Sequence, residues 1–494
     1  MKRRLFLGAA AAALAAPALH VRAQTATSLL EEARMLAGRP YRSDELPLPP
    51  PFAGLDYDAY RGIRPIPGRA SMLPHGPDYA VDLLPPGLYF PDPVRIELAA
   101  PGGFREIPFS TDLFSFDPRY FGDIPDTSPG AGFSGLRLRH PLNAADRMDE
   151  AMVLQGASYF RAIGRAMVYG LSARAVALGT GGAEPEEFPR FTRLRLHRPR
   201  QGRVRIEGVI DSPSLAGHLE MELRPGVETE MEVATTILPR REIGDIGIAP
   251  LTSMYLKGPL RASVSDDFRP RVHDSDVLFV ENGAGEKLWR PISNPARVQT
   301  SAFLDDGPVG FGLYQTARSF EDYQDTEARY HDRPNAVVRP SGDWGRGAVM
   351  LVEIPTGDEF MDNVVAFWRP EAPLAGGSAH RFDYRLTWTL APPDTGGAHI
   401  VQSRSGREHD RPGTRRYVID FDSVAEGLSA DVAALGAGEV SGPSVFPLPE
   451  GRGTRVTFLF APGDADAEDL RLTLRGAPAP VWLHRWTRAR DGGV

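Results

Sequence analysis

The stretch LRLHRPRQGRVRIEGV, residues 194–209, decides the fold class of this 494-residue chain. Apolar and polar residues alternate over 194–198 and again over 204–209, on either side of a turn that contains Pro and Gly. The same pattern recurs over 219–223 and 230–233. A period of two places successive side chains on opposite faces of a strand. Each pair of segments therefore predicts an antiparallel hairpin with one solvated face.

The rest of the chain extends this pattern to an all-β fold class: a large antiparallel β-sandwich domain followed by a smaller immunoglobulin-like β-sandwich domain. Short strands, with 46 prolines and 51 glycines spread along the chain, favour an antiparallel sandwich over a parallel α/β sheet. A capping-box pattern at Ser28-Leu29-Leu30-Glu31 predicts one short helix, which continues to Leu36 and is stopped by Gly38.

A segment rich in Pro, Gly and Asp, Ala391–Gly397, predicts a linker. Four strand-like runs follow it, at 417–421, 456–460, 470–474 and 481–483. This spacing is typical of an immunoglobulin-like sandwich, here without the cysteines of antibody domains. We expect a β-sandwich domain over 24–390, a linker over 391–399 and an immunoglobulin-like domain over 400–494.

The first residues have the form of an export signal. Lys2-Arg3-Arg4 precede Phe6-Leu7 and an Ala/Leu-rich apolar stretch, which ends in a small-residue cleavage site at Ala23. The paired arginines indicate a twin-arginine (Tat) signal peptide over 1–23. The alternative is a membrane anchor, but the apolar run is shorter than the ~20 residues that a span needs. We expect a periplasmic protein without a stable membrane span.

Composition excludes several classes of function. The chain has no cysteine, which rules out disulfides, iron–sulfur clusters and thiolate zinc sites. It has no Walker loop, no dinucleotide-binding glycine motif after a strand and no H-E-x-x-H motif. The pairs His273-Asp274 and His331-Asp332 are more often loop residues than metal ligands. We therefore expect no cofactor and no metal, and the net charge of -8 argues against nucleic acid as a partner.

Carboxylates, arginines and aromatic residues crowd into the middle third of the chain. The segments are Val272–Ser275, Leu288–Pro291, Ala328–Pro334, Gly342–Gly345 and Glu353–Asn363. Sugars are bound by aromatic faces and charged groups, and two carboxyls of unlike protonation cleave glycosidic bonds. Structural explanations compete, because ion pairs in turns contribute under ~1 kcal/mol and a single Trp is more often in the core.

Several motifs in order resemble the periplasmic glucan biosynthesis proteins G and D. These are Gly156–Arg161, Val168–Arg174, Glu187–Phe191, Ala249–Met254 and the block from His273 to Trp368. The resemblance extends over nearly all of the mature chain, is weaker in its carboxyl-terminal part, and is closer to the D branch, whose members carry a Tat leader. It implies a β-sandwich with a long cleft, joined by a short helical linker to an immunoglobulin-like domain.

The resemblance also implies roles for individual residues in the binding or cleavage of β-1,2-glucan chains. Asp362 matches the general acid and Asp274 the general base of an inverting glycoside hydrolase or related transglycosylase. The remaining expected substrate-binding residues are Tyr330, Arg333, Glu359, Trp344, Trp289 and Ser275, of which Tyr330, Arg333 and Glu359 match the family's cleft. As further partners, the resemblance allows for a homodimer and for contact with the membrane glucan synthase.

The residues around the two aspartates agree with these roles. Asp362 precedes the apolar run Val364–Trp368, which predicts burial and a raised pKa, whereas Asp274 has polar neighbours and should stay ionised. Inverting enzymes separate their carboxyls by roughly 6.5–9.5 Å. The resemblance implies that the base acts through a chain of water and a substrate hydroxyl, so a wider gap would not contradict the pairing. The competing hypothesis is a non-catalytic glucan-binding or scaffold protein, which needs no acid–base pair.

Overall fold

A computed structural model describes residues 28–42, 47–125, 128, 130–261, 266–424 and 426–492. The predicted Tat signal peptide lies outside these residues. The described chain is built mainly from antiparallel sheets, which confirms the predicted all-β sandwich class. Its helices are short: α1 (Leu29–Ala37), α2 (Tyr57–Arg61), α3 (Phe320–Tyr323), α4 (Arg488–Asp491), and the 3-10 turns η1 (Thr111–Leu113), η2 (Tyr330–Asp332) and η3 (Pro449–Gly451).

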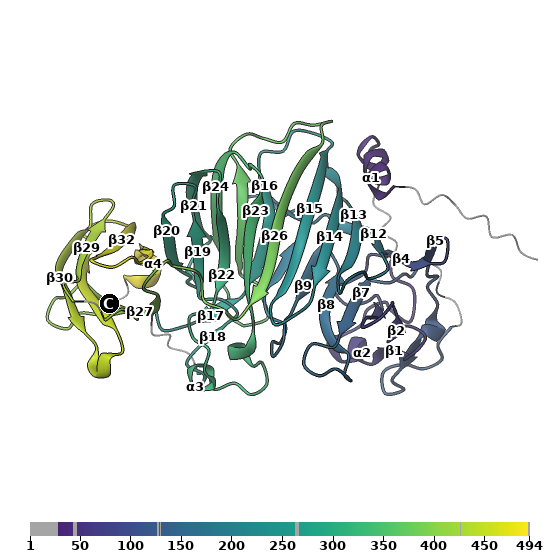
Figure 1. Ribbon diagram of the computed structural model, residues 1–494, viewed down its shortest axis with the longest axis horizontal. Helices are drawn as coiled ribbons and strands as arrows, with labels where there is room; N and C mark the ends of the chain where they lie inside the picture. Colours follow the sequence, from purple (N-terminus) through teal and green to yellow (C-terminus); the bar gives the residue numbers. More distant parts are fainter. Residues whose placement is uncertain are drawn as a thin grey trace, which may run out of the picture.

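Two large sheets form the body of the molecule, and Figure 1 shows their strands as a broad fan. The first has the order β2 (Leu73–Pro74), β3 (Ala80–Leu84), β7 (Gly135–His140), β8 (Asp149–Gln155), β9 (Tyr159–Ala162), β10 (Ser172–Arg174), β16 (Ile246–Ser253), β25 (Val364–Pro370), β24 (Arg346–Glu353) and β21 (Gln299–Asp306), with β11 (Val176–Leu178) also paired to β16.

The second large sheet has the order β29 (Ser429–Ala434), β32 (Ala467–Arg475), β33 (Val481–Thr487), β20 (Lys287–Pro291), β19 (Val277–Glu281), β22 (Gly310–Tyr314), β23 (Asn335–Ser341), β26 (His380–Thr389), β15 (Thr229–Pro239), β14 (Leu215–Arg224), β13 (Val204–Asp211), β12 (Arg190–Leu196), β4 (Arg95–Ala100) and β5 (Gly103–Glu106). The main core joins buried residues of both sheets, such as Leu154 of the first and Leu219 of the second, so the sheets pack face to face.

Smaller sheets complete the fold. They pair β1 (Ile63–Pro65) with β6 (Phe114–Phe116), β17 (Tyr255–Lys257) with β18 (Val272–His273), and β27 (Ile400–Arg407), β28 (Arg415–Phe421), β31 (Thr454–Ala461) and β30 (Glu439–Pro447) in that order. Of these, the β17–β18 pair positions a candidate site residue, because Asp274 follows β18 in the chain.

Both predicted hairpins form. Leu196 lies opposite Ile206 in β12–β13, and Leu223 lies opposite Met231 in β14–β15. The expectation of one solvated face is wrong for the far half of β13 and β14. There α1 packs on the outer side of the sheet, and a separate cluster joins Leu29 and Leu36 to Val209. The predicted helix is therefore present and fills a structural role, although Ser28 makes no side-chain capping hydrogen bond.

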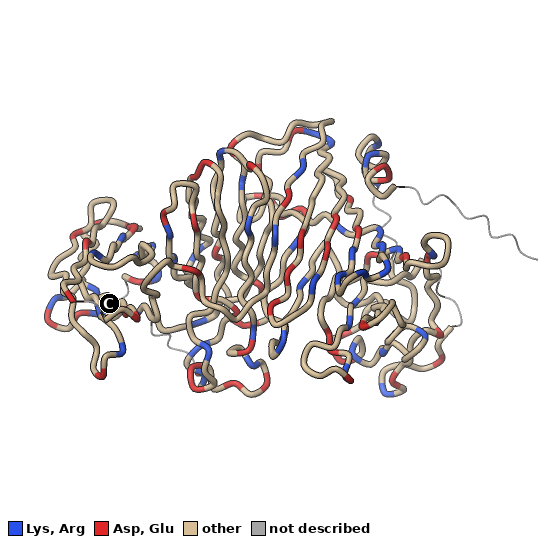
Figure 2. The backbone as a smooth tube through the Cα atoms, viewed as in Figure 1, with Lys and Arg blue, Asp and Glu red and all other residues tan. Residues whose placement is uncertain are grey.

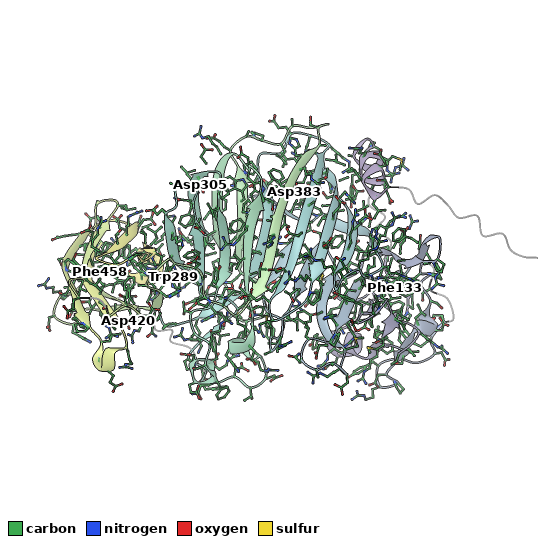
Figure 3. The ribbon with its side chains drawn as sticks, viewed as in Figure 1. Phe133, Trp289, Asp305, Asp383, Asp420 and Phe458 are labelled. Carbon is green, nitrogen blue, oxygen red and sulfur yellow. The ribbon has the colours of Figure 1, made fainter. Side chains whose placement is uncertain are left out.

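The carboxyl-terminal strands lie at one end of the fan, coloured yellow in Figure 1. All four predicted runs are strands, namely β28, β31, β32 and β33. β33 pairs in parallel with β20, with Trp482 opposite Trp289, so this part of the chain extends the second large sheet. Figure 3 labels Trp289 at this junction. Trp289, Tyr417 and Trp482 belong to one buried cluster, so the last strands share a core with the body of the molecule.

Candidate active site

Asp274 is a buried carboxylate with a dedicated cationic partner. Its backbone N–H donates to the carbonyl of Met254 at 2.8 Å, which fixes the residue at the end of β18. The residue is 4% exposed, and Arg333 Nη1 lies 2.5 Å from its Oδ1. Burying an unpaired charge costs several kcal/mol, so the guanidinium of Arg333 is what permits a carboxylate at this position.

Asp362 lies in a different setting, directly before β25. Its side chain reaches solvent. Desolvation by the surrounding protein, and then the negative charge of Asp274, raise the pKa of Asp362 above its ordinary value, while Arg161 and Arg174 oppose the shift without cancelling it. The raised pKa predicted from the sequence is therefore confirmed in direction, and the two aspartates are close enough to interact.

Asn363 holds the two aspartate-bearing segments together. Its Oδ1 accepts from the backbone N–H of Tyr255 at 2.8 Å, and its Nδ2 donates to the carbonyls of Tyr255 at 3.0 Å and Ile354 at 2.9 Å. Tyr255 starts β17, the strand that pairs with β18. A fully buried amide thus ties the Asp362 loop to the strand pair that carries Asp274.

A network of Tyr330, Glu359 and Arg269 lies beside this pair. The hydroxyl of Tyr330 donates to Glu359 Oε2, and burial followed by this hydrogen bond raises the pKa of Tyr330. Arg269 Nη1 contacts Glu359 Oε2 at 2.7 Å and Asp325 at 2.9 Å. The guanidinium carbon of Arg333 lies 4.2 Å from the centre of the Tyr330 ring. Arg333 therefore connects the Tyr330–Glu359 pair to Asp274.

Close packing explains one glycine of the motif Val168–Arg174. A Cβ on Gly170 would lie 2.9 Å from the Cβ of Arg333, too close for any ordinary contact. Glycine at this position leaves room for the Arg333 stem and so preserves its contact with Asp274.

His273 is a buried core residue of the β17–β18 strand pair. The imidazole is fully buried and stacks on Tyr255, with ring centres 5.4 Å apart. Burial lowers the pKa of His273 to about 4, so the ring is neutral near pH 7. Within the described residues, no group of three or more His, Asp or Glu side chains has an arrangement that could hold a metal ion.

Three of the expected substrate-binding residues are buried and do not face an open surface beside Asp274 and Asp362. Ser275 is fully buried and accepts a hydrogen bond from Ser253 at 2.9 Å. Trp344 is 7% exposed, packs among the core aromatics and donates to the carbonyl of Asp383 at 3.2 Å. Trp289 is buried at the junction with the carboxyl-terminal strands. Because stacking on a sugar needs an open ring face, neither buried tryptophan fits the expected sugar-binding role in this structure, and the buried hydroxyl of Ser275 does not face an open surface.

The structure instead provides an aromatic-lined cavity of about 380 Å³, and two of its lining residues interact electrostatically with Asp362. Its wall includes Tyr159 and Arg161, both within electrostatic reach of the Asp362 carboxyl. The exposed rings of Tyr89 and Phe188 line the same cavity. Sequence analysis assigned no role to these residues, although three of them lie in the motifs Gly156–Arg161 and Glu187–Phe191. Arg269 was also missed, since nothing in its local sequence indicates the distant partner Glu359.

Comparisons with known proteins agree with this architecture. A family model described as periplasmic glucan biosynthesis protein, MdoG, matches residues 25–486. Glucans biosynthesis protein G of Shewanella frigidimarina is 41% identical over 472 residues, covering 93% of this chain and 84% of that protein. Glucans biosynthesis protein G of Vibrio cholerae is 41% identical over 467 residues, covering 92% of this chain and 85% of the relative.

The fold and the similarity together define a protein of the all-β class that serves glucan biosynthesis in the periplasm. The chain belongs to the periplasmic glucan biosynthesis protein family MdoG. Both of these relatives are protein G, and the expected likeness to the D branch is drawn from the leader, which lies outside the described residues. No helix of the described residues is long and apolar enough to cross a membrane.

Proposed function

We propose that this chain acts on β-1,2-glucan as an inverting, endo-acting glycoside hydrolase or transglycosylase, with Asp362 as general acid and Asp274 as general base. The observation that carries the proposal is the contrast between the two carboxyls. Asp362 is an exposed residue whose carboxyl has a pKa raised by partial desolvation and by the charge of Asp274, whereas Asp274 is buried against Arg333. A pair of carboxyls in unlike environments is what acid–base cleavage of a glycosidic bond requires.

The reaction proceeds by one displacement. Protonated Asp362 gives its proton to the glycosidic oxygen, and the bond to the anomeric carbon breaks with its electron pair on that oxygen. Water attacks the opposite face of the anomeric carbon, and its proton passes through solvent and a substrate hydroxyl to Asp274. In transglycosylation, a sugar hydroxyl takes the place of water. Asp362 ends ionised and Asp274 protonated, so one proton must return to Asp362 before the next turnover.

This proton transfer is helped by the fixed positions of three side chains, Tyr330, Glu359 and Arg333. The Tyr330 hydroxyl is held by Glu359, and Arg333 contacts both the Tyr330 ring and Asp274. These contacts restrict the orientations that the Tyr330 hydroxyl and the Asp274 carboxylate can adopt. Preorganised dipoles of this kind stabilise charge that develops in the transition state.

Product stereochemistry tests the paired roles. Proton NMR during early digestion of linear β-1,2-glucan should show the α-anomer first, since a single displacement inverts a β-linkage. Asp362→Asn and Asp274→Asn should each abolish its appearance. Asp358→Asn, on the same exposed loop as Asp362, is the matched control and should keep activity. First appearance of the β-anomer would overturn the assignment.

The competing candidate is a non-catalytic glucan-binding or scaffold protein, which the aromatic-lined cavity would also suit. A reducing-end assay separates the two candidates. Saturable binding of β-1,2-glucan without new reducing ends or transfer products in the wild-type protein would select the scaffold.

We further propose that the mature protein begins at Gln24 after export by the Tat route. Replacing Arg3 and Arg4 by Lys should leave precursor in the cytoplasm, because the Tat machinery reads the arginine pair. Processing of this double variant at the wild-type rate would contradict the route.

The division into 24–390, 391–399 and 400–494 also stays a proposal, as do a homodimer and contact with the membrane glucan synthase. Limited proteolysis should cut first within 391–399 if this segment is a linker. Sedimentation of the mature protein across a concentration series tests the homodimer, and crosslinking in membranes that contain the synthase tests the contact.

A further inference from the structure

The turn between β12 and β13 is held in a defined conformation by hydrogen bonds. Arg200 and Arg203 exchange backbone hydrogen bonds at 2.9 and 3.0 Å across Gln201 and Gly202. These two central residues have φ values of 51° and 72°, as a two-residue hairpin turn of type I′ requires. The hydroxyl of Tyr79 donates to the carbonyl of Gly202 at 2.9 Å and anchors the turn to the body of the molecule.

A cavity of about 390 Å³ lies at this turn. It is lined by His197, Arg198, Arg200, Gln201, Arg203, Arg205 and Glu222. The one carboxylate of the wall, Glu222, is 2.8 Å from Arg203, and Arg205 pairs with Glu220 on β14. We call this feature the arginine cavity.

Arg198 and Arg200 carry the excess positive charge of the arginine cavity. Both are exposed, and within the described residues neither has a carboxylate at ion-pair distance. On the same sheet, the exposed arginines of β26 follow a different pattern, since Arg381 pairs with Asp383 and Arg385 with Glu232. Figure 2 shows both signs of charge interspersed over much of the molecule. Arg198 and Arg200 thus bring two guanidiniums without a carboxylate partner to the wall of one cavity, on a chain whose net charge is -8.

The arginine cavity shares no residue with the candidate active site or with the aromatic-lined cavity. None of its side chains contacts Asp274, Arg333 or the Tyr330–Glu359 pair. The proposed reaction therefore makes no use of it, and a second ligand would not have to compete with glucan.

We propose that the arginine cavity binds the phosphate group of an organic phosphate ester. A guanidinium offers parallel N–H donors whose geometry matches two oxygens of a phosphate, and Arg198 and Arg200 together balance the charge of a dianion. A water molecule occupies roughly 30 Å³, so the cavity holds about a dozen waters and has room for the organic part of the ester. The ester is either a free metabolite or the headgroup of an anionic lipid.

Calorimetric titration of the mature full-length protein tests the phosphate site. Glycerol 3-phosphate and inorganic phosphate should both bind at low ionic strength, and added salt should weaken the binding. Arg198→Gln/Arg200→Gln should weaken it at least tenfold. The matched control, Arg346→Gln/Arg475→Gln, removes the same charge from distant exposed arginines that pair with Glu371 and Asp431, and it should bind as wild type.

Because Arg198 and Arg200 are exposed and unpaired, their double variant should melt within about 1 °C of wild type, which separates lost binding from lost folding. Three results would overturn the proposal: no saturable binding to wild-type protein, equal binding to the double variant, or equally tight binding of acetate as a carboxylate probe.

Vesicle flotation identifies the source of the phosphate. If lipid headgroups are the ligand, the protein should float with vesicles of 30% phosphatidylglycerol in phosphatidylcholine, remain behind with pure phosphatidylcholine, and lose flotation in Arg198→Gln/Arg200→Gln. Binding of glycerol 3-phosphate without flotation supports the same site with a free ester as its ligand. Flotation that the double variant retains would place membrane binding elsewhere and overturn the lipid source.

Discussion

Removal of the positive charge of Arg333 should destabilise the protein because it leaves Asp274 buried without a partner. Breaking a buried ion pair from one side costs about 3–5 kcal/mol. The Arg333 side chain is 20% exposed and that of Asp274 is 6% exposed, so solvent compensates part of this cost, and we expect about 3 kcal/mol for Arg333→Gln. At roughly 2 cal/mol/K of unfolding entropy per residue, this corresponds to about 3 °C in melting temperature.

The double variant Arg333→Gln/Asp274→Asn provides the control, since neither charge then remains. It should recover to within about 1 °C of wild type while glucan cleavage stays abolished, because the base is missing. Scanning calorimetry at pH 7 measures the stability and a reducing-end assay the activity. The reasoning fails if Arg333→Gln melts at the wild-type temperature, or if the double variant is less stable than Arg333→Gln alone.

Four further predictions concern three single variants. Asp362→Asn should lower cleavage at least ~10²-fold. The folded-state pKa of Asp362 is raised, so its stabilising contribution is complete below the ordinary pKa of about 3.9 and is lost as pH rises through the raised pKa. Asp362→Asn cannot ionise, and its melting temperature should therefore fall less than that of wild type between about pH 4 and pH 8. An identical pH profile of melting temperature would contradict the pKa shift. Tyr330→Phe removes the hydroxyl bound to Glu359 and should lower kcat with little change in KM; a change in KM alone would assign it to uniform binding. Trp344→Ala should lower stability by about 3–5 kcal/mol, as expected for a buried core side chain, and leave the KM of folded enzyme unchanged, whereas a raised KM with normal melting would restore a platform role.

The local sequence indicates the environment of Asp362 correctly but that of Trp344 wrongly. The apolar run after Asp362 correctly indicates the direction of its pKa shift, whose first cause is desolvation. The second cause, the charge of Asp274, comes from a separate strand pair. The indole of Trp344 illustrates the opposite case, because a loop rich in Gly and Asp suggests exposure while the folded chain packs the ring against Phe382 and Tyr384. Composition cannot distinguish a sugar platform from a core ring.

The sequence by itself determined the all-β class, both hairpins and the carboxyl-terminal strands. Alternation with a period of two is a local property, and it sets which side chains share a face wherever the strand pairs. Only the tertiary structure decided that Asn363 bridges to Tyr255, that Arg333 reaches Asp274, and that Arg269 reaches Glu359. These contacts join residues far apart in the chain, so they exist only after the sheets have packed and set the distances between charges.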